Sequence, residues 1–182
     1  MILKKISTLD AVFITLMAAC GLALKPIIGP LSKLISSVLL MPGGSIAGAV
    51  YMMWPMLALL VVKEKGTASL VGLIEGVIVT ISGIYGSHGI LSIITYLLPC
   101  LFIDASYMLL KQWENRLKFF IPPALGNTVG SLLVVMFFLH LPLIPLLIGL
   151  IPAFIFGGLG GLLALKLYKL LIASFPQFAK DA

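Results

Sequence analysis

One acidic residue is a candidate for chemistry because it lies in the middle of an apolar segment. Glu75 is near the centre of residues 67–85, between Gly72 and Gly76, and no basic residue is close to it in the sequence. Burying a carboxylate in hydrocarbon is costly unless it is paired or neutralised. Two interpretations stay open: Glu75 contacts a cationic or amine-bearing ligand, or it makes a structural hydrogen bond to another segment.

A second group of residues combines glycine-rich turns, aromatic side chains and a histidine. The connection 83–89 reads GIYGSHG and contains Tyr85 and His88. Its glycines allow tight turns, while the tyrosine and the histidine offer an aromatic face and a titratable hydrogen-bonding group. Each aromatic residue taken alone also fits an interfacial belt, but together they predict an outward-facing pocket for a small planar ligand. The neighbouring apolar segments add three aromatic residues: Tyr51, Trp54 and Tyr96.

Three further polar residues are weaker candidates. Asn127 lies in the apolar run 119–139, where a buried amide bonds to another helix or contacts a ligand. Asp104 is expected to cap a helix or to pair with an inner basic residue such as Lys111. His140 is a candidate lid residue in the last outer loop.

The sequence lacks the short motifs of common catalytic and nucleotide-binding sites. It contains no HExxH, no Walker A phosphate loop, no CxxC pair and no acidic cluster for a divalent metal. Cys20 and Cys100 each lie in an apolar run, which argues against a disulfide framework or a thiolate metal site. We therefore expect no enzyme, no resident metal and no cofactor, and any uphill transport must draw its energy from partner proteins or from an ion gradient.

The elements that position these residues follow from the composition. Of 182 residues, 61% are apolar and 10% are charged, against roughly 45–50% and 25% in soluble domains. Twelve basic and six acidic residues are too few to coat a soluble globule of this size. The net charge of +6 does not indicate nucleic-acid binding, because the basic residues lie in short loops. We predict one integral, all-α membrane domain spanning residues 1–182.

Six apolar runs are long enough to cross a hydrocarbon core of about 30 Å as helices. The stretch 27–40 contains Lys33 and is bounded by Pro30 and Pro42, so we predict a short interfacial or re-entrant segment between the first two helices. Pro145 and Pro152 predict a loop or kink at the start of the last run. The six runs are residues 9–24, 44–62, 67–85, 89–110, 119–139 and 143–173.

The basic residues set the orientation. Lys and Arg near span ends favour the cytoplasmic side, so both termini are predicted inside, in a multi-pass protein of a bacterial-type cell membrane. Lys4 and Lys5, followed by an apolar stretch ending at Cys20, resemble a lipoprotein signal peptide, but Asp10 interrupts that stretch and a first membrane helix is favoured. Lys25 and Lys33 then lie outside, and ten basic residues lie inside: Lys4, Lys5, Lys63, Lys65, Lys111, Arg116, Lys118, Lys166, Lys169 and Lys180.

Pairs of small residues one helical turn apart are plentiful. In lipid, helices associate by close packing through such residues, so each pair fits packing within the bundle better than an interface with another protein. The pairs are Ala19/Ala23, Gly44/Gly48, Gly72/Gly76, Gly126/Gly130 and Gly157/Gly161.

A chain of this length with six spans and both termini inside resembles the substrate-binding S component of an energy-coupling factor (ECF) transporter. The most informative stretches are 41–54, MPGGSIAGAVYMMW, and 72–104, GLIEGVIVTISGIYGSHGILSIITYLLPCLFID. They are similar to S components associated with thiamine or its hydroxymethylpyrimidine precursor. The resemblance implies that a vitamin binds in the outer half of the bundle, beneath outer loops that here contain 41–45, 85–89 and 140–145.

The resemblance also implies partners. In that family an AxxxA motif on the first helix docks against the membrane-embedded T component, and Ala19 and Ala23 match it. Two cytoplasmic ATPase subunits supply the energy, and the S component topples in the membrane to release its ligand inside. The candidate substrate-binding residues are Tyr51, Trp54, Glu75, Tyr85, His88, Tyr96 and Asn127.

The identity of the ligand and the class of function have alternatives. Thiamine sites in the family are rich in tryptophan, whereas only Trp54 lies in the outer half of this chain. Glu75 still suits a ligand with an amino group or a cationic ring. A small membrane scaffold or assembly subunit without a ligand, and a proton-coupled carrier that uses Glu75 as its relay, are the alternatives.

Overall fold

The computed structural model describes residues 6–38, 43–83, 89–113, 115–139 and 142–175. Within these ranges every regular element is a helix, which confirms the predicted all-α fold. The elements are α1 (Thr8–Val38), α2 (Gly43–Tyr51), α3 (Met53–Val62), α4 (Thr67–Ser82), α5 (Leu91–Leu109), α6 (Leu117–Val134), the π-helix η1 (Val135–Leu139) and α7 (Leu143–Ser174).

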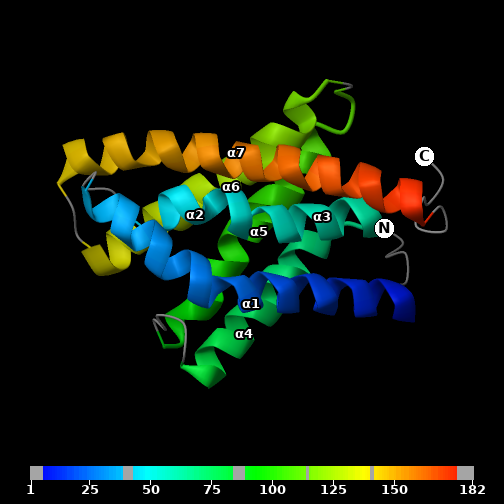
Figure 1. The fold of residues 1–182 in the computed structure, drawn as a ribbon, viewed down its shortest axis with the longest axis horizontal. Helices are drawn as coiled ribbons and strands as arrows, with labels where there is room; N and C mark the ends of the chain where they lie inside the picture. The colour runs from blue at the N-terminus through cyan, green and yellow to red at the C-terminus, as the bar shows by residue number, and fades with distance from the viewer. Residues whose placement is uncertain (1–5, 39–42, 84–88, 114, 140–141, 176–182) are drawn as a thin grey trace.

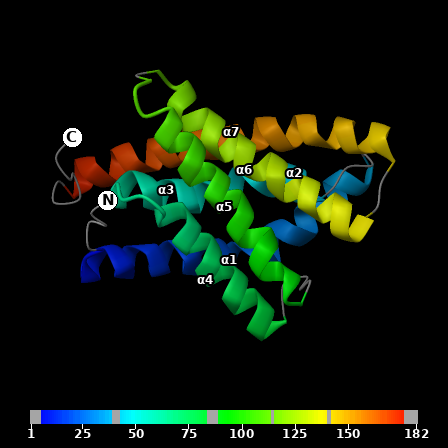
Figure 2. The same ribbon diagram turned by 180° about the vertical axis from the view of Figure 1, so that it is seen from behind.

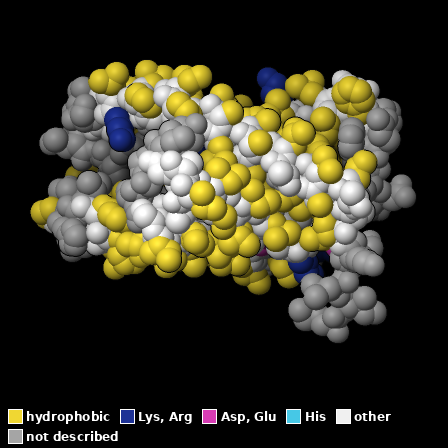
Figure 3. All heavy atoms as spheres, turned by 90° about the horizontal axis from the view of Figure 1, so that it is seen from below, with side chains coloured by type: hydrophobic (Ala, Val, Ile, Leu, Met, Phe, Trp, Pro, Cys, Tyr) yellow, Lys and Arg dark blue, Asp and Glu magenta, His cyan; other side chains and the backbone are white. Residues whose placement is uncertain are grey.

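Five helical stretches in the described ranges are long and apolar enough to cross a membrane, and α4 is a shorter apolar helix. They correspond to the predicted runs: α2 and α3 together form the second, and α6 with η1 forms the fifth. Figure 3 shows hydrophobic side chains over most of one face, with Lys and Arg in only a few places. The protein is therefore a multi-pass membrane protein.

Two helix boundaries differ from the prediction. α1 continues without a break to Val38, through Pro26 and Pro30, so the separate interfacial or re-entrant segment predicted at 27–40 is wrong in its described part. α7 likewise runs unbroken from Leu143 and contains Pro152. Membrane helices tolerate proline because neighbouring groups can satisfy the freed carbonyls. Consequently Lys25 lies inside a long helix and not in an outer loop.

α2 and α3 lie at the centre of the bundle. Figures 1 and 2 show them between α1 and α7, and both pack against these two helices. α3 also contacts α4 and α5, and its residues from Pro55 to Val62 are all buried. The start of α1 and the end of α7 lie at the same end of the bundle, as expected for an even number of crossings.

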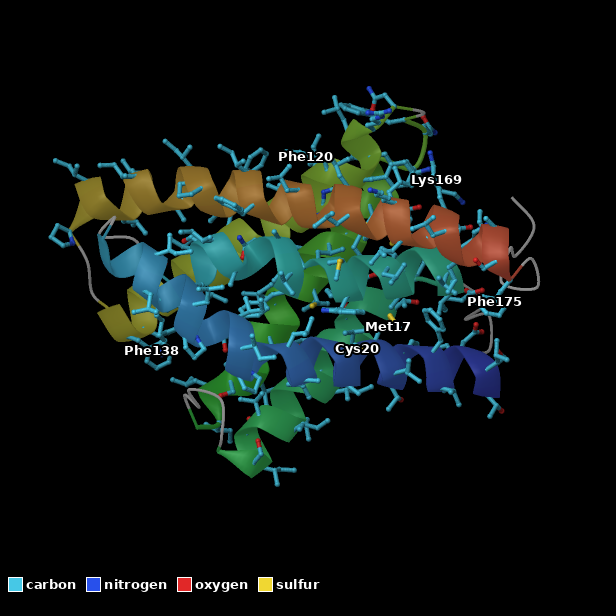
Figure 4. The ribbon with its side chains drawn as sticks, viewed as in Figure 1. Met17, Cys20, Phe120, Phe138, Lys169 and Phe175 are labelled. Atoms are coloured by element: carbon cyan, nitrogen blue, oxygen red, sulfur yellow. The ribbon has the colours of Figure 1, made fainter. Side chains whose placement is uncertain are left out.

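The labelled side chains indicate the two ends of the molecule. In Figure 4, Lys169 on α7 lies towards the end where α1 begins, whereas Phe138 of η1 lies at the opposite end. This placement agrees with the prediction that Lys169 belongs to the basic, inner side. Which end faces the cytoplasm stays a prediction from the positions of the basic residues.

Glycines form the closest helix contacts. Gly72 and Gly76 of α4 lie directly against the backbone of α5: a Cβ atom on Gly76 would lie 2.9 Å from the Cα atom of Ile93. Gly126 of α6 lies equally close to α5, and Gly157 of α7 lies close to α6. These glycines therefore pack within the bundle, as predicted.

The contact at Gly72 predicts a loss of stability on substitution. A Cβ atom at this position would lie 2.6 Å from the backbone oxygen of Tyr96 and 2.7 Å from Sγ of Cys100. Gly72→Ala should destabilise the protein by about 1–3 kcal/mol, as overpacking does, and lower the melting temperature in detergent. In the control Gly44→Ala the added methyl group meets no atom within 4 Å, and the melting temperature should not fall. Equal melting temperatures for the two variants would contradict this packing.

Candidate functional site

A cavity of about 160 Å³, partly open to the surface, lies between the helices. Four predicted substrate-binding residues line it, namely Tyr51, Glu75, Tyr96 and Asn127, whereas Tyr85 and His88 lie outside the described residues. The cavity joins residues from the six helices α1 to α6. The other lining residues are Lys25 of α1, Gly44 of α2, Met52, Pro55 of α3, Thr95, Pro99 and Cys100 of α5, and Gly130, Ser131 and Val134 of α6.

A buried ion pair crosses the cavity. Nζ of Lys25 lies 2.5 Å from Oε2 of Glu75, and the two side chains are only 7% and 9% exposed. The same ammonium lies 3.8 Å from the ring centroid of Tyr96 and 5.7 Å from that of Tyr51. The structural partner of Glu75 is thus a lysine fifty residues earlier in the chain. A carboxylate and two aromatic faces together surround one positive charge.

Glycines on α1 allow this helix to reach Glu75. Gly21, Lys25 and Gly29 are spaced by four residues, so they share one helix face. A methyl group on Gly21 would collide with Oε1 of Glu75, and one on Gly29 would lie 3.6 Å from the hydroxyl group of Tyr51. The first would be a collision and the second an ordinary contact, so the missing side chain of Gly21 is what lets α1 pack closely enough for Lys25 to reach the carboxylate.

Close packing of α4 on α5 places Tyr96 beside the ion pair. Gly72 and Gly76 lie one turn apart on α4, and a Cβ atom on Gly76 would lie 3.3 Å from Cβ of Tyr96. Glu75 is adjacent to Gly76 in the sequence. The glycine pair that the sequence analysis assigned to packing therefore also brings the acid and the aromatic ring together.

Two prolines that line the cavity lack the N–H group of a regular helical hydrogen bond. Proline has no N–H group, so Pro55 and Pro99 cannot donate to the carbonyl groups of Tyr51 and Thr95, four residues earlier. The break between α2 and α3 comes directly after Tyr51, the residue four positions before Pro55. Tyr51 and Thr95 themselves line the cavity.

Asn127 connects three helices at the wall of the cavity. Its Nδ2 atom donates to the carbonyl oxygens of Ser45, at 3.0 Å, and of Ala153, at 2.8 Å. A methyl group on Gly48 would collide with this amide. The predicted cross-helix hydrogen bond is therefore present, and contact of Asn127 with a ligand stays a prediction.

Trp54 lies behind the ion pair and does not line the cavity. A Cβ atom on Gly21 would lie 3.4 Å from Cδ1 of Trp54 and would also collide with Glu75. The indole ring and the carboxylate therefore both lie next to Gly21. The indole Nε1 is buried and has no hydrogen-bond partner among the described residues.

Asp104 has a structural role outside the cavity. It accepts hydrogen bonds from the backbone N–H groups of Ala68, at 3.3 Å, and Ser69, at 2.8 Å, and from the hydroxyl group of Ser69. These donors lie in the first turn of α4, where helical N–H groups lack intrahelical partners. Asp104 thus caps α4, which is one of the two roles expected for it.

The two alanines of the AxxxA motif lie on the opposite side of α1 from the site. Ala19 and Ala23 are exposed, whereas Gly21 and Lys25 are buried. α1 therefore directs one face to the cavity and leaves the alanine face free for lipid or a partner. Docking of this face stays a prediction.

Sequence reasoning missed Lys25, which it placed in an outer loop. The error follows from ending the first helix at residue 24 instead of Val38. With the helix extended from Thr8 to Val38, Lys25 lies near its middle, where a charged residue requires a partner of opposite sign. The apolar sequence that continues beyond Lys25 was the signal that could have placed this lysine inside the helix.

The ion pair predicts a non-additive pattern of stability. Glu75→Gln and Lys25→Met each leave one buried charge without its partner, which costs about 3–5 kcal/mol. The double variant leaves neither charge, so it should be more stable than either single variant. Melting temperatures of the three purified variants and the unsubstituted protein form the thermodynamic cycle. Additive losses would show that the two side chains act independently.

Comparison with known proteins identifies a family. A model of the family described as "ABC-type cobalt transport system, permease component" matches residues 9–130, which is about two thirds of the chain. The matched region contains α1 to α5, most of α6 and nearly all of the cavity wall. No curated protein and no solved structure matches the chain. The chain belongs to the family of permease components of ABC-type cobalt transport systems and is a membrane component of an ECF-type transporter.

Proposed function

We propose that this protein is the substrate-binding S component of an ECF-type importer, and that its cavity binds an organic amine or cation, either thiamine or hydroxymethylpyrimidine. The observation that carries the proposal is the buried carboxylate of Glu75, placed with Tyr51 and Tyr96 on the wall of one cavity. Carboxylates and aromatic faces recognise organic cations by charge pairing and cation–π attraction. Membership in a transport family supports the same reading.

The size of the cavity favours a small ring. Its volume is about 160 Å³, close to the roughly 150 Å³ of an engineered cavity that binds benzene. One six-membered ring, such as a pyrimidine, therefore fits the space beside Lys25. The carbonyl groups of Tyr51 and Thr95, which lack a helical donor at Pro55 and Pro99, are candidate acceptors for the amino group of such a ring.

The family description also names cobalt, which makes Co²⁺ a second candidate substrate. The geometry of the cavity favours an organic ligand over this ion. Glu75 is the one carboxylate among the described residues that line the cavity. In the ranges that the structure describes, no three His, Cys, Asp or Glu side chains gather to hold a metal ion.

The energy for import comes, in this proposal, from partner subunits. A T component would dock on the exposed face of α1 that contains Ala19 and Ala23, and two cytoplasmic ATPases would drive release of the ligand. Small residues on an exposed membrane helix allow close approach of a second helix.

The first test is ligand binding by the purified protein. Thiamine or hydroxymethylpyrimidine should raise its melting temperature in a concentration-dependent way, since a ligand that binds only the folded state stabilises it by mass action. Glu75→Gln should weaken binding of thiamine by tenfold or more, about 1.4 kcal/mol, because it removes the countercharge of its cationic ring. Glu64→Gln, at a residue that does not line the cavity, is the control and should leave the affinity unchanged.

Other outcomes of this test point to other functions. Stabilisation by Co²⁺ but by neither organic compound would favour metal import. No stabilisation by any of the three would favour a scaffold subunit. Uptake that requires a proton gradient and no ATPase partner would favour a carrier that uses Glu75.

The second test concerns the alanine face of α1. Ala19→Leu combined with Ala23→Leu should abolish vitamin uptake in cells while leaving ligand binding intact, because the added side chains block a close helix contact. Val77→Leu combined with Ile81→Leu places two leucines one turn apart on exposed positions of α4 and is the matched control. Normal uptake by the alanine double variant would refute the docking role.

A further inference from the structure

We infer that Lys25 is an internal competitor for the ligand: its ammonium occupies the cation position between Glu75, Tyr51 and Tyr96 and is displaced when an organic cation binds. The inference rests on the proposed function, because it assumes that the cavity is the ligand site. It assigns a role to the residue that the sequence analysis did not connect with the site.

The geometry around Nζ of Lys25 resembles the way proteins bind cationic ligands. The atom lies 2.5 Å from a carboxylate oxygen of Glu75 and 3.8 Å from the ring centroid of Tyr96. Its distance to the ring centroid of Tyr51 is 5.7 Å. Aromatic rings and a carboxylate around an ammonium are the typical environment of a bound organic cation. In this structure, the chain's own lysine fills that environment.

A second positive charge cannot share this position at low cost. Lys25 and Glu75 are both buried, and like charges repel strongly where the effective dielectric constant is low. A cationic ligand that pairs with Glu75 must therefore displace the ammonium. A neutral ligand does not face this competition.

The volume of the cavity also distinguishes a neutral ligand from a cationic one. With Lys25 in place, the space of about 160 Å³ suits one aromatic ring. Hydroxymethylpyrimidine has one ring and no permanent charge, whereas thiamine has two rings, one of them a cationic thiazolium. Displacement of Lys25 would open room for the second ring at the position that attracts its charge.

The surroundings of Lys25 permit such a movement. Its four-carbon side chain is flexible, and the residues one turn away on the same face of α1 are Gly21 and Gly29. Glu75 and Trp54 fill the space beside Gly21, whereas a Cβ atom on Gly29 would meet only the hydroxyl group of Tyr51, at 3.6 Å. The open direction for the ammonium is therefore towards Gly29.

The decisive experiment compares two probes on one variant. Lys25→Met removes the competitor, so the dissociation constant of thiamine should fall roughly tenfold or more, because the fraction of molecules with an open cation position rises. Hydroxymethylpyrimidine should gain much less affinity than thiamine. Lys33→Met changes an exposed lysine on the same helix and should leave both dissociation constants unchanged.

Weaker or unchanged binding of thiamine by Lys25→Met would overturn the inference. Weaker binding would show that Lys25 contacts the ligand, and unchanged binding would show that it does not compete. If the unsubstituted protein binds thiamine with the expected dependence on Glu75, such a result leaves the proposed function standing. If it binds neither probe, both proposals fail.

A measurement on the unsubstituted protein covers the case in which Lys25→Met does not fold. Modification of Lys25 by a small amine-reactive acetylating reagent can be quantified by mass spectrometry with and without thiamine. Displacement from Glu75 should increase the modification of Lys25 severalfold, with Lys33 as the internal reference. An unchanged or lower modification of Lys25 would overturn the inference.

Discussion

The architecture of this protein depends on one buried ion pair. An ammonium and a carboxylate inside a membrane bundle are tolerated only when each compensates the other, and Lys25 and Glu75 do so across α1 and α4. The pair fixes how these two helices face each other. It also creates the strongest electrostatic feature of the cavity, since two tyrosine rings surround the same positive charge. Under the proposed function, structural stability and ligand recognition therefore share the same atoms.

Glycine packing makes this arrangement possible. Lipid gives no hydrophobic drive for helix association, so the helices must fit closely, and they do so where side chains are absent. Gly21 accommodates the carboxylate of Glu75, Gly48 the amide of Asn127, and Gly76 the α5 backbone near Tyr96. The residues that allow packing are thus those that place the polar groups. Close packing at glycines thus assembles a cavity that combines a charge pair, aromatic rings and an amide.

The sequence by itself determined the membrane spans and most of the described site. Apolar length sets the crossings, because every backbone polar group must be satisfied within a helix. The cost of burying a charge singled out Glu75, and the clustering of aromatic residues singled out Tyr51 and Tyr96, which the cavity confirms as neighbours. Asn127 followed from the same argument about buried polar groups. Trp54 was selected by type and lies behind the cavity wall.

Only the tertiary structure decided which residue neutralises Glu75. Lys25 and Glu75 are fifty residues apart, and their contact depends on how α1 and α4 are rotated about their axes. In a soluble protein an apolar stripe would reveal that rotation. Here lipid and protein interior are equally apolar, so the pattern of hydrophobic residues does not distinguish one helix face from another. Span lengths are encoded locally, whereas helix rotation, and with it the cation position, arises from packing between helices.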